Sequence, residues 1–523
     1  MPTKALRWPM LGVVRRDVLR TAPGTRGPWP AAWAVNCRVQ DNIDRRLRGG
    51  SRPGLTKYVA DDMGTTIADI ASIDVSSAAS GASEVLFVLV DSAVKTVEGG
   101  TTTTQVAYLT TSTGDIVTDT SGNQITVGTG SAPSSGFLVT GQQMVFAVTT
   151  SGITKMDPKT GQTDTLVTSG GTIPTSCTFG AVYRDRMCLS GADNTVYMSR
   201  QGDYTDWDTG VHVENRGRPV PFQLALGADI GPLPTAMIAH KDATMLVASS
   251  QSLWLLSGDP AADGSLRRVS ENVGIIGDRA WCKVEDTVFF LATDGVYHVG
   301  ADGSGLTPLS EVTVPEELRD VDTSTTTVSM GLDYDRLAFH VFLRTSGGSD
   351  THWAYELQTE SWWPVRLPDD QSPLATCQHA GELLLAGNDG YIRKVSGDDD
   401  DGTAISSHVA IGPVRMGHEQ GFGRLLRLYG MTAAGSADVT WRLIVGNTAE
   451  EAADNSKLCI EALQAGTSTE SYVHSSGTWE AGINRRAYPR ARGQWMSILL
   501  SASGQWAFEG CQAETVHSGK WRG

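Results

Sequence analysis

The feature that most constrains the fold of this sequence is a short unit that recurs through its middle. Each unit has a run of small and apolar residues, a turn with Asp-Gly or a Ser/Gly pair, and a second run with an apolar or aromatic centre. The plainest example joins Met187-Cys188-Leu189 to Val196-Tyr197-Met198 across a turn-rich segment. This pattern predicts a β-hairpin. Comparable units begin near residues 85, 144, 245, 288, 337 and 383, so the spacing is about 40 to 60 residues.

A lone hairpin exposes one face and both edges, so these units must pack against one another. Radial stacking, as in a β-propeller, buries the faces and leaves only short edges. We therefore expect residues 61–403 to form a β-propeller of six or seven blades. The alternative is a large two-sheet sandwich.

The rest of the chain also predicts β-structure. The 58 glycines among 523 residues and the lack of a long amphipathic period favour an all-β chain, with one short helix expected at 311–319. After residue 403 the pattern changes to apolar stretches separated by polar turns, which predicts a C-terminal β-sandwich or jelly-roll-like domain over 404–523. The expected strands are 409–414, 423–430, 439–445, 470–473, 494–501 and 506–509.

The formal charge of −16 is distributed unevenly. Residues 1–60 carry a net charge of +9, residues 404–523 carry +1, and residues 61–403 carry −26. A basic N-terminal arm can bind nucleic-acid phosphates, but this arm also contains Trp8, Trp29 and Trp33, which favour packing. We expect the arm, residues 1–60, to dock on the chain's own acidic body or on an acidic neighbour. An acidic body could also line a passage for DNA without adhering to it.

Several stretches resemble tailed-phage virion proteins. The segment 33–39 contains an "A-x-N" strand, and the segment 47–55 contains a basic turn followed by "R-P-G", as at the start of many of these proteins. The segment 184–207 is similar to their shared blade, and 486–495 with 506–509 is similar to their closing region. The blade resemblance is carried by Arg184-Asp185-Arg186, Gly191, Val196-Tyr197, Ser199, Gly202-Asp203 and Asp206-Trp207. The group includes the tail nozzle, or tail tubular protein B, of short-tailed bacteriophages.

The resemblance implies a structural virion protein that forms a homohexameric ring under the portal and adaptor. Such a ring continues the DNA channel and holds it shut until ejection. The implied partners are further copies of the chain, adaptor or portal and tail fibre proteins, and viral double-stranded DNA that passes without sequence-specific binding. The implied location is the virion tail, after assembly in the host cytoplasm. The chain is shorter than the longest members, which puts an extended tip domain in doubt.

Two sets of residues are candidate sites. We expect the first set to contact a neighbouring subunit or the adaptor: Arg7, Trp8, Arg45, Arg46, Arg48, Arg52, Arg486, Arg490 and Arg492. The second is the acidic run Asp398, Asp399, Asp400 and Asp401, between the expected propeller and the C-terminal domain. It could face the channel and repel DNA, or bind a divalent cation. The alternative is a solvated linker.

The sequence gives no positive signal for catalysis. It lacks a Gly-x-Ser-x-Gly elbow, a phosphate loop ending in Gly-Lys-Ser/Thr, a Gly-x-Gly-x-x-Gly loop and a His-Glu-x-x-His motif. The ten histidines show no metal-ligand spacing, and the seven cysteines have no Cys-x-x-Cys pair. We therefore expect no enzyme activity, no metal, no cofactor, and buried thiols from a reducing cytoplasm. We also expect no secretory signal and no membrane insertion.

Two other functions remain open on the sequence. The C-terminal tryptophans Trp441, Trp479, Trp495 and Trp506 could stack on a host glycan, although tryptophans in strands more often form core or subunit contacts. Propellers also include glycoside hydrolases, which need two facing carboxylates. Asp185 and Asp206 could be proposed for that role, but they fit better as turn and loop carboxylates.

Overall fold

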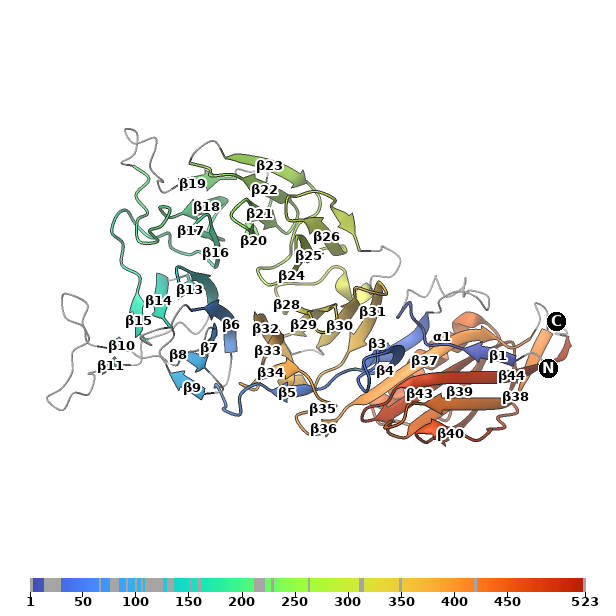
Figure 1. The fold of residues 1–523 in the computed structure, drawn as a ribbon. Coiled ribbons are helices and arrows are strands. Elements are labelled where there is room, and N and C mark those ends of the chain that lie inside the picture. Colours follow the sequence, from blue (N-terminus) through green and yellow to red (C-terminus); the bar gives the residue numbers. More distant parts are fainter. Residues whose placement is uncertain are drawn as a thin grey trace.

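The chain folds into two β-bodies that lie side by side in a computed structural model (Figure 1). The structure describes residues 3–13, 30–64, 67–75, 84–90, 93–98, 101–104, 107–108, 126–128, 136–150, 152–158, 162–210, 222–226, 230–261, 264–309, 315–347, 350–417 and 421–520. The statements below concern these residues.

The first body is a propeller of seven antiparallel sheets. Blade 1 contains β6 (Ile67–Asp74), β7 (Glu84–Val90), β8 (Ala93–Glu98) and β9 (Thr101–Thr104). Blade 2 contains β12 (Phe137–Gly141), β13 (Met144–Thr149), β14 (Gly152–Asp157) and β15 (Gln162–Thr165). Blade 3 contains β16 (Phe179–Tyr183), β17 (Arg186–Ser190), β18 (Thr195–Met198) and β19 (Phe222–Ala225). Blade 4 contains β20 (Pro234–His240), β21 (Thr244–Ser249), β22 (Leu253–Ser257) and β23 (Ser265–Ser270).

Blade 5 contains β24 (Trp281–Val284), β25 (Thr287–Ala292), β26 (Gly295–Gly300) and β27 (Thr307–Pro308). Blade 6 contains β28 (Thr326–Asp333), β29 (Ala338–Thr345), β30 (Thr351–Glu356) and β31 (Ser361–Val365). Blade 7 contains β32 (Pro373–His379), β33 (Glu382–Gly387) and β34 (Ile392–Val395). A separate hairpin of β10 (Ala107–Tyr108) and β11 (Thr126–Gly128) lies between blades 1 and 2 in the sequence.

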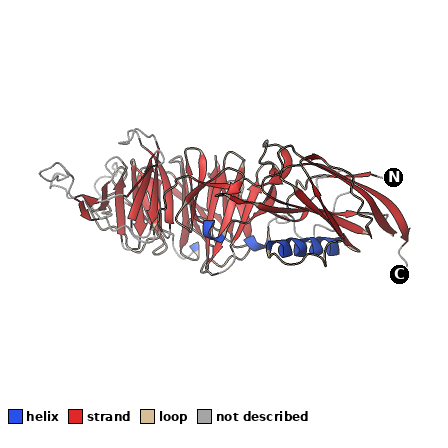
Figure 2. Cartoon of the chain, turned by 90° about the horizontal axis from the view of Figure 1, so that it is seen from below, coloured by secondary structure: helices blue, strands red, loops and turns tan. Residues whose placement is uncertain are grey.

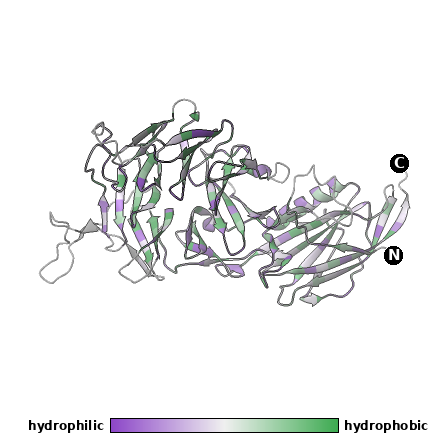
Figure 3. Cartoon of the chain, turned by 45° about the horizontal axis from the view of Figure 1, so that its top comes forward, coloured by the Kyte–Doolittle hydropathy of each residue, from purple (hydrophilic) through white to green (hydrophobic). Residues whose placement is uncertain are grey.

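Each blade is buried on both of its faces, which explains the continuous apolar runs in the sequence. In β7, Leu86 and Val88 pack with blade 7, whereas Phe87 and Leu89 pack with blade 2. Alternate side chains of a strand point to opposite faces, so a strand between two neighbours must be apolar throughout. Hydrophobic residues accordingly lie along the strands of both bodies (Figure 3).

The ring is closed by a strand from the N-terminal segment. β5 (Leu55–Lys57) pairs with β34 of blade 7, with Thr56 opposite Lys394. The short strands β35 (Asp399–Asp400) and β36 (Thr403–Ala404) extend the same sheet. Because β5 and β34 lie far apart in the sequence, this pairing ties the two ends of the propeller together.

The second body is a β-sandwich of two five-stranded sheets. Sheet A has β1 (Thr3–Leu6), β44 (Phe508–Lys520), β38 (Gly421–Thr432), β41 (Gly482–Ile483) and β42 (Arg492–Gly493). Sheet C has β2 (Ala31–Val35), β37 (Ser406–Arg415), β43 (Trp495–Ser503), β39 (Val439–Gly446) and β40 (Ser475–Trp479). Leu425 and Leu428 of sheet A share a core with Ile498 and Leu500 of sheet C. The expected propeller followed by a sandwich is therefore confirmed, with seven blades.

The N-terminal segment is distributed over both bodies. β1 and β2 belong to the two sandwich sheets, the hairpin of β3 (Cys37–Gln40) and β4 (Leu47–Ser51) lies between the bodies, and β5 belongs to the propeller. The described residues of this segment, 3–13 and 30–60, therefore pack on both bodies of their own chain.

The helix content differs from the expectation. Within the expected helix 311–319, the structure has only the 3₁₀ turn η3 (Glu316–Leu318), and residues 311–314 lie outside the described part. A second 3₁₀ turn is η4 (Asp369–Gln371). The α-helix α1 (Ala449–Gln464) was not anticipated, and it packs on sheet C (Figure 2). The expected strand 470–473 is a turn that precedes β40.

Candidate functional site

The two N-terminal motifs meet at the junction between the propeller and the sandwich. Asn36 follows β2 with a φ of 56°. Its Oδ1 accepts hydrogen bonds from Arg52 Nε at 2.9 Å and from the backbone N–H of Arg366 at 2.8 Å, while its Nδ2 donates to the carbonyl of Ser406 at 2.9 Å. Arg366 follows blade 6 and Ser406 begins the sandwich. A single amide side chain therefore contacts both bodies.

Arg52 completes this junction with a buried ion pair. Its Nη1 and Nη2 donate to the two carboxylate oxygens of Asp400 at 2.9 and 2.6 Å. Further donations go to the carbonyls of Pro53 at 2.8 Å and Arg366 at 3.1 Å. The Arg52 and Asp400 side chains are 4% and 6% exposed, so the pair is shielded from solvent. The geometry is the two-pronged arginine–carboxylate arrangement that gives strong and directional pairing.

Glycine is required beside this pair. A Cβ on Gly54 would lie 1.9 Å from the backbone oxygen of Asp399, closer than any side chain allows. The "R-P-G" motif thus supplies a guanidinium for Asp400 and a close backbone approach to its neighbour.

A second cluster fixes the β3–β4 hairpin to sheet A. Arg48 pairs with Asp41 at 2.9 Å, with Asp44 at 2.6 Å, and with Glu509 of β44. Burial opposes the charged guanidinium, but the hydrogen bonds and charges of these three carboxylates prevail and raise the pKa of Arg48. Arg46 lies 3.7 Å from Glu509, and Arg45 pairs with Asp335 of the propeller at 2.6 Å, both at exposed positions.

The structure divides the expected interface residues into two groups. Trp8 is 3% exposed and stacks on Trp363 at 5.8 Å, so it belongs to the core that joins the two bodies. Arg48 and Arg52 are also committed to pairs inside the chain. Trp8, Arg48 and Arg52 are therefore unavailable to a neighbour, a correction to the expectation. The exposed members are Arg7, Arg45, Arg46, Arg486, Arg490 and Arg492.

The acidic run 398–401 is also corrected. Asp400 is buried against Arg52, and Asp401 pairs with Arg393 at 2.6 Å. Asp399 accepts the Gly402 N–H at 3.0 Å within a turn, and Asp398 is exposed. Asp400 and Asp401 are therefore committed to ion pairs inside the chain, whereas a channel-facing position for Asp398 stays a prediction. Among the described residues, no group of three or more His, Cys, Asp or Glu side chains could hold a metal ion.

Three C-terminal arginines of the expected set are exposed residues of the sandwich. Together with their exposed neighbours they form what we call the basic face: Arg424, Arg485, Arg486, Arg490 and Arg492. Arg486 lies over the Tyr429 ring at 5.3 Å and Arg492 over the Phe422 ring at 4.9 Å, both from strand β38. Cation–π contacts of this kind hold a guanidinium in place while it keeps its outward charge.

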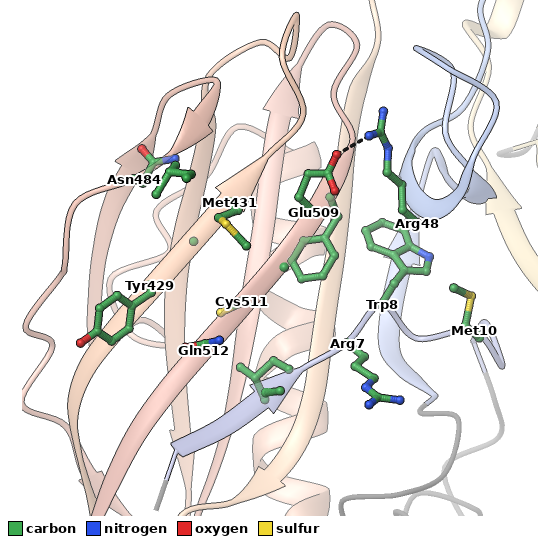
Figure 4. Close-up of a pocket in the computed structure, with 16 residues that line it drawn as sticks. Arg7, Trp8, Met10, Arg48, Tyr429, Met431, Asn484, Glu509, Cys511 and Gln512 are labelled. Atoms are coloured by element: carbon green, nitrogen blue, oxygen red, sulfur yellow. Dashed lines mark hydrogen bonds and ion pairs between the residues drawn. The ribbon is translucent and has the colours of Figure 1, made fainter. Parts of the chain in front are cut away.

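A groove lies on sheet A (Figure 4), and it adjoins the basic face because Tyr429, which carries Arg486 over its ring, also lines the groove. Its volume is about 510 Å³, and its lining includes Arg7 and Trp8 near β1, Tyr429 and Met431 of β38, and Ile483 of β41. Ile483 is 87% exposed. An open groove with an exposed aliphatic side chain and adjacent arginines has the composition of a protein contact.

The tryptophans of the glycan hypothesis are mostly internal. Trp441, Trp479 and Trp506 are 5%, 1% and 0% exposed, so they are core side chains. Trp495 is partly exposed, and Arg415 covers its ring at 5.4 Å. Three of the four therefore have no free face for a sugar. Asp206 accepts the backbone N–H of Asp208 at 3.1 Å and pairs with Arg200 at 3.3 Å, and Asp185 accepts the Tyr204 hydroxyl at 3.2 Å, which agrees with loop carboxylates.

An ion pair at the propeller axis was not predicted from the sequence. Arg279, just before the innermost strand of blade 5, pairs with Asp69 of blade 1 at 2.9 Å and donates to the Gly136 carbonyl before blade 2 at 3.1 Å. In a ring of seven blades, contacts from blade 5 to blades 1 and 2 cross the central axis. Burial opposes its charge, but Asp69 and Asp278 raise the pKa of Arg279. The side chain thus bridges the axis of the disc.

Comparisons with known proteins give no relative by sequence: neither a protein-family model nor a curated protein matches. Solved structures with partial likeness include virginiamycin B lyase from Staphylococcus aureus, at 10% identity and a TM-score of 0.40 over 65% of this chain and 97% of that chain. The WD40 β-propeller domain of Doa1 matches at 12% identity and a TM-score of 0.36 over 66% and 96% of the two chains. BamB from Moraxella catarrhalis matches at 11% identity and a TM-score of 0.35, over 65% of this chain and 97% of that chain. Within the described residues, no helix is long and apolar enough to span a membrane.

Proposed function

We propose that this chain is a ring-forming structural protein of a virion tail, a nozzle of the short-tailed phage type. In this role it attaches to the portal and adaptor and continues and gates the channel through which DNA is ejected. The observation that carries the proposal is the junction. Both halves of the N-terminal resemblance meet there: Arg52 donates to Asn36 and pairs with Asp400, and Asn36 contacts residues of both the propeller and the sandwich.

Two further features support a mechanical role. The junction pairs are buried and saturated, which suits a rigid wall that must transmit load between two bodies. Arg279 bridges the axis of each disc, so a ring of this protein would carry DNA in a lumen between copies. The acidic charge of residues 61–403 would keep a duplex from adhering to that wall.

The proposal predicts that the isolated protein, or the protein mixed with its adaptor, forms a closed ring. Light scattering should give a mass roughly six times that of one chain, because homo-oligomers close by rotational symmetry. Cryo-electron microscopy of the particle should show a continuous lumen with double-stranded DNA in it. A stable monomer that stays monomeric with adaptor present, and that is absent from virions, would contradict the proposal.

The docking role of the N-terminal arginines needs variants restricted to exposed positions. A change of Arg48 or Arg52 would disrupt the junction itself, because both lie in ion pairs inside the chain. Arg7, Arg45 and Arg46 are exposed and suit the experiment.

A further inference from the structure

We infer that the basic face of the sandwich binds an acidic segment on the propeller of a neighbouring copy. The inference rests on the proposed ring and assigns the two surfaces that would form its contact. On one side are Arg424, Arg485, Arg486, Arg490 and Arg492. On the other is the segment between blades 5 and 6, with Glu316, Glu317, Asp320 and Asp322.

The basic face has the properties of a contact centre. All five of its arginines are exposed, and two are held over aromatic rings of β38. Beside them lie exposed apolar side chains: Ile483 at 87%, Tyr488 at 58% and Met431 at 37%. Arginine, tyrosine and methionine are enriched in protein interfaces, and exposed apolar area supplies the association energy.

Within the described residues, none of the five arginines forms an ion pair with a carboxylate. Glu514 of sheet A acts on Arg486 electrostatically, but it is paired with Arg427 at 3.1 Å and accepts the Tyr429 hydroxyl at 2.8 Å. A partner that supplies negative charge would neutralise these arginines.

The blade 5–6 segment supplies that charge at high density. Four acids and one arginine, the half-buried Arg319, occur within the seven residues 316–322, and all four acids are exposed. Asp294 of the β25–β26 turn lies beside them, since the Asp320 N–H donates to the Thr293 carbonyl at 2.7 Å. Hydrogen bonds from Ser324 and Thr325 lower the pKa of Asp322, so its charge persists into mildly acidic solution.

The two surfaces are compatible with a closed assembly of identical copies. Both are exposed in the isolated chain, so neither neutralises the other within one copy. A contact between two different patches is heterologous, and repetition of such a contact generates a ring when the rotation closes. A neighbouring copy of this chain is therefore the partner that the charges fit best.

The test is a charge reversal of the basic face. The triple variant Arg485→Glu, Arg486→Glu, Arg490→Glu changes exposed residues of the irregular segment between β41 and β42. Like charges across a contact oppose binding, so the dissociation constant between copies should rise on the order of 100-fold. The double variant Glu316→Lys, Glu317→Lys should weaken assembly in the same way. Combining both sets in one chain should restore the ring, because each contact then has opposite charges again.

The matched control has the same change of net charge at dispersed exposed positions: Lys241→Glu, Arg267→Glu, Lys457→Glu. It should assemble like the unaltered chain in light scattering. If the unaltered chain forms rings and the triple variant forms them equally well, the inference is wrong and the proposed function stands. If the unaltered chain never assembles with adaptor, the proposed function itself fails. If the triple variant loses affinity for a fluorescent DNA duplex while its assembly is unchanged, the basic face binds nucleic acid and the inference is overturned.

Discussion

At the scale of single residues, Arg52 and Arg45 show how differently two arginines of one segment act. Both lie in the basic N-terminal segment and both pair with an aspartate. Arg45 is 56% exposed, where water and salt screen the pair. Arg52 is 4% exposed and uses its Nε and both terminal nitrogens in hydrogen bonds. Its partner Asp400 would be a buried, unpaired charge without it.

Replacement of Arg52 by alanine should therefore lower the free energy of unfolding by about 3–5 kcal/mol, since it leaves a buried carboxylate without its cation. The same replacement of Arg45 should cost less than about 1 kcal/mol. Urea unfolding followed by tryptophan fluorescence compares the two variants. A loss at Arg52 no larger than that at Arg45 would show that the junction pair does not stabilise the fold.

Two buried histidines make the stability of the fold depend on pH. Burial lowers the pKa of His352 to about 4, and its Nε2 lies 2.8 Å from the Ser372 hydroxyl. Burial, with a smaller effect from Arg442, also lowers the pKa of His408 to about 4. An unfolded histidine titrates near 6.5, so the unfolded chain binds more protons between that pH and about 4. The contribution of these two histidines to the free energy of unfolding is therefore fully present above pH 6.5 and is lost as the pH falls toward 4.

The size of this effect follows from the shift. For each histidine, a pKa lowered from 6.5 to about 4 corresponds to roughly 3 kcal/mol lost by pH 4. Replacement of His352 by glutamine should reduce the slope of unfolding free energy against pH by close to one proton over this range. The slope is measured from urea titrations at a series of pH values. An unchanged slope would mean that His352 is already protonated in the folded protein.

At the scale of elements, the blades could be predicted because the signals for each blade lie in neighbouring residues of the sequence. The apolar run of β7 and the turns between paired strands are properties of neighbouring residues. The sequence did not distinguish six blades from seven, because blade 7 is completed by β5, which comes from the far end of the chain. Helix α1 had a readable start: Thr448 accepts the Glu451 N–H at 3.0 Å, and the Glu451 carboxylate accepts the Asn447 N–H at 2.8 Å. This capping pattern was outweighed by the all-β composition.

The candidate site was less predictable for a related reason. The run 398–401 is visible as charge, but its partner Arg52 lies 348 positions away from Asp400. The pairing of Arg279 with Asp69 spans 210 positions and follows no motif. The sequence shows which side chains are charged, but only the folded ring shows which of them form ion pairs. The basic face was found in part because Arg486, Arg490 and Arg492 lie close together in the chain.

At the scale of the whole molecule, the position of Arg279 decides where a passage can be. The seven sheets lie around a common centre (Figure 1), and Arg279 reaches from blade 5 across that centre to Asp69, which is 5% exposed. A duplex threaded through one disc would have to displace this side chain and leave the buried Asp69 carboxylate without its cation, at a cost of about 3–5 kcal/mol. A lumen between copies requires no such disruption.

We therefore predict that DNA density in assembled particles lies only in the shared lumen, with Arg279 bridging the axis of every propeller. Cryo-electron microscopy of particles fixed during ejection tests this directly. The variant Arg279→Met should unfold at lower urea concentration, because it removes the cation beside Asp69, while the ring retains its mass and its lumen. Duplex density along the axis of a single propeller would refute the arrangement, because that path is the one that Arg279 closes.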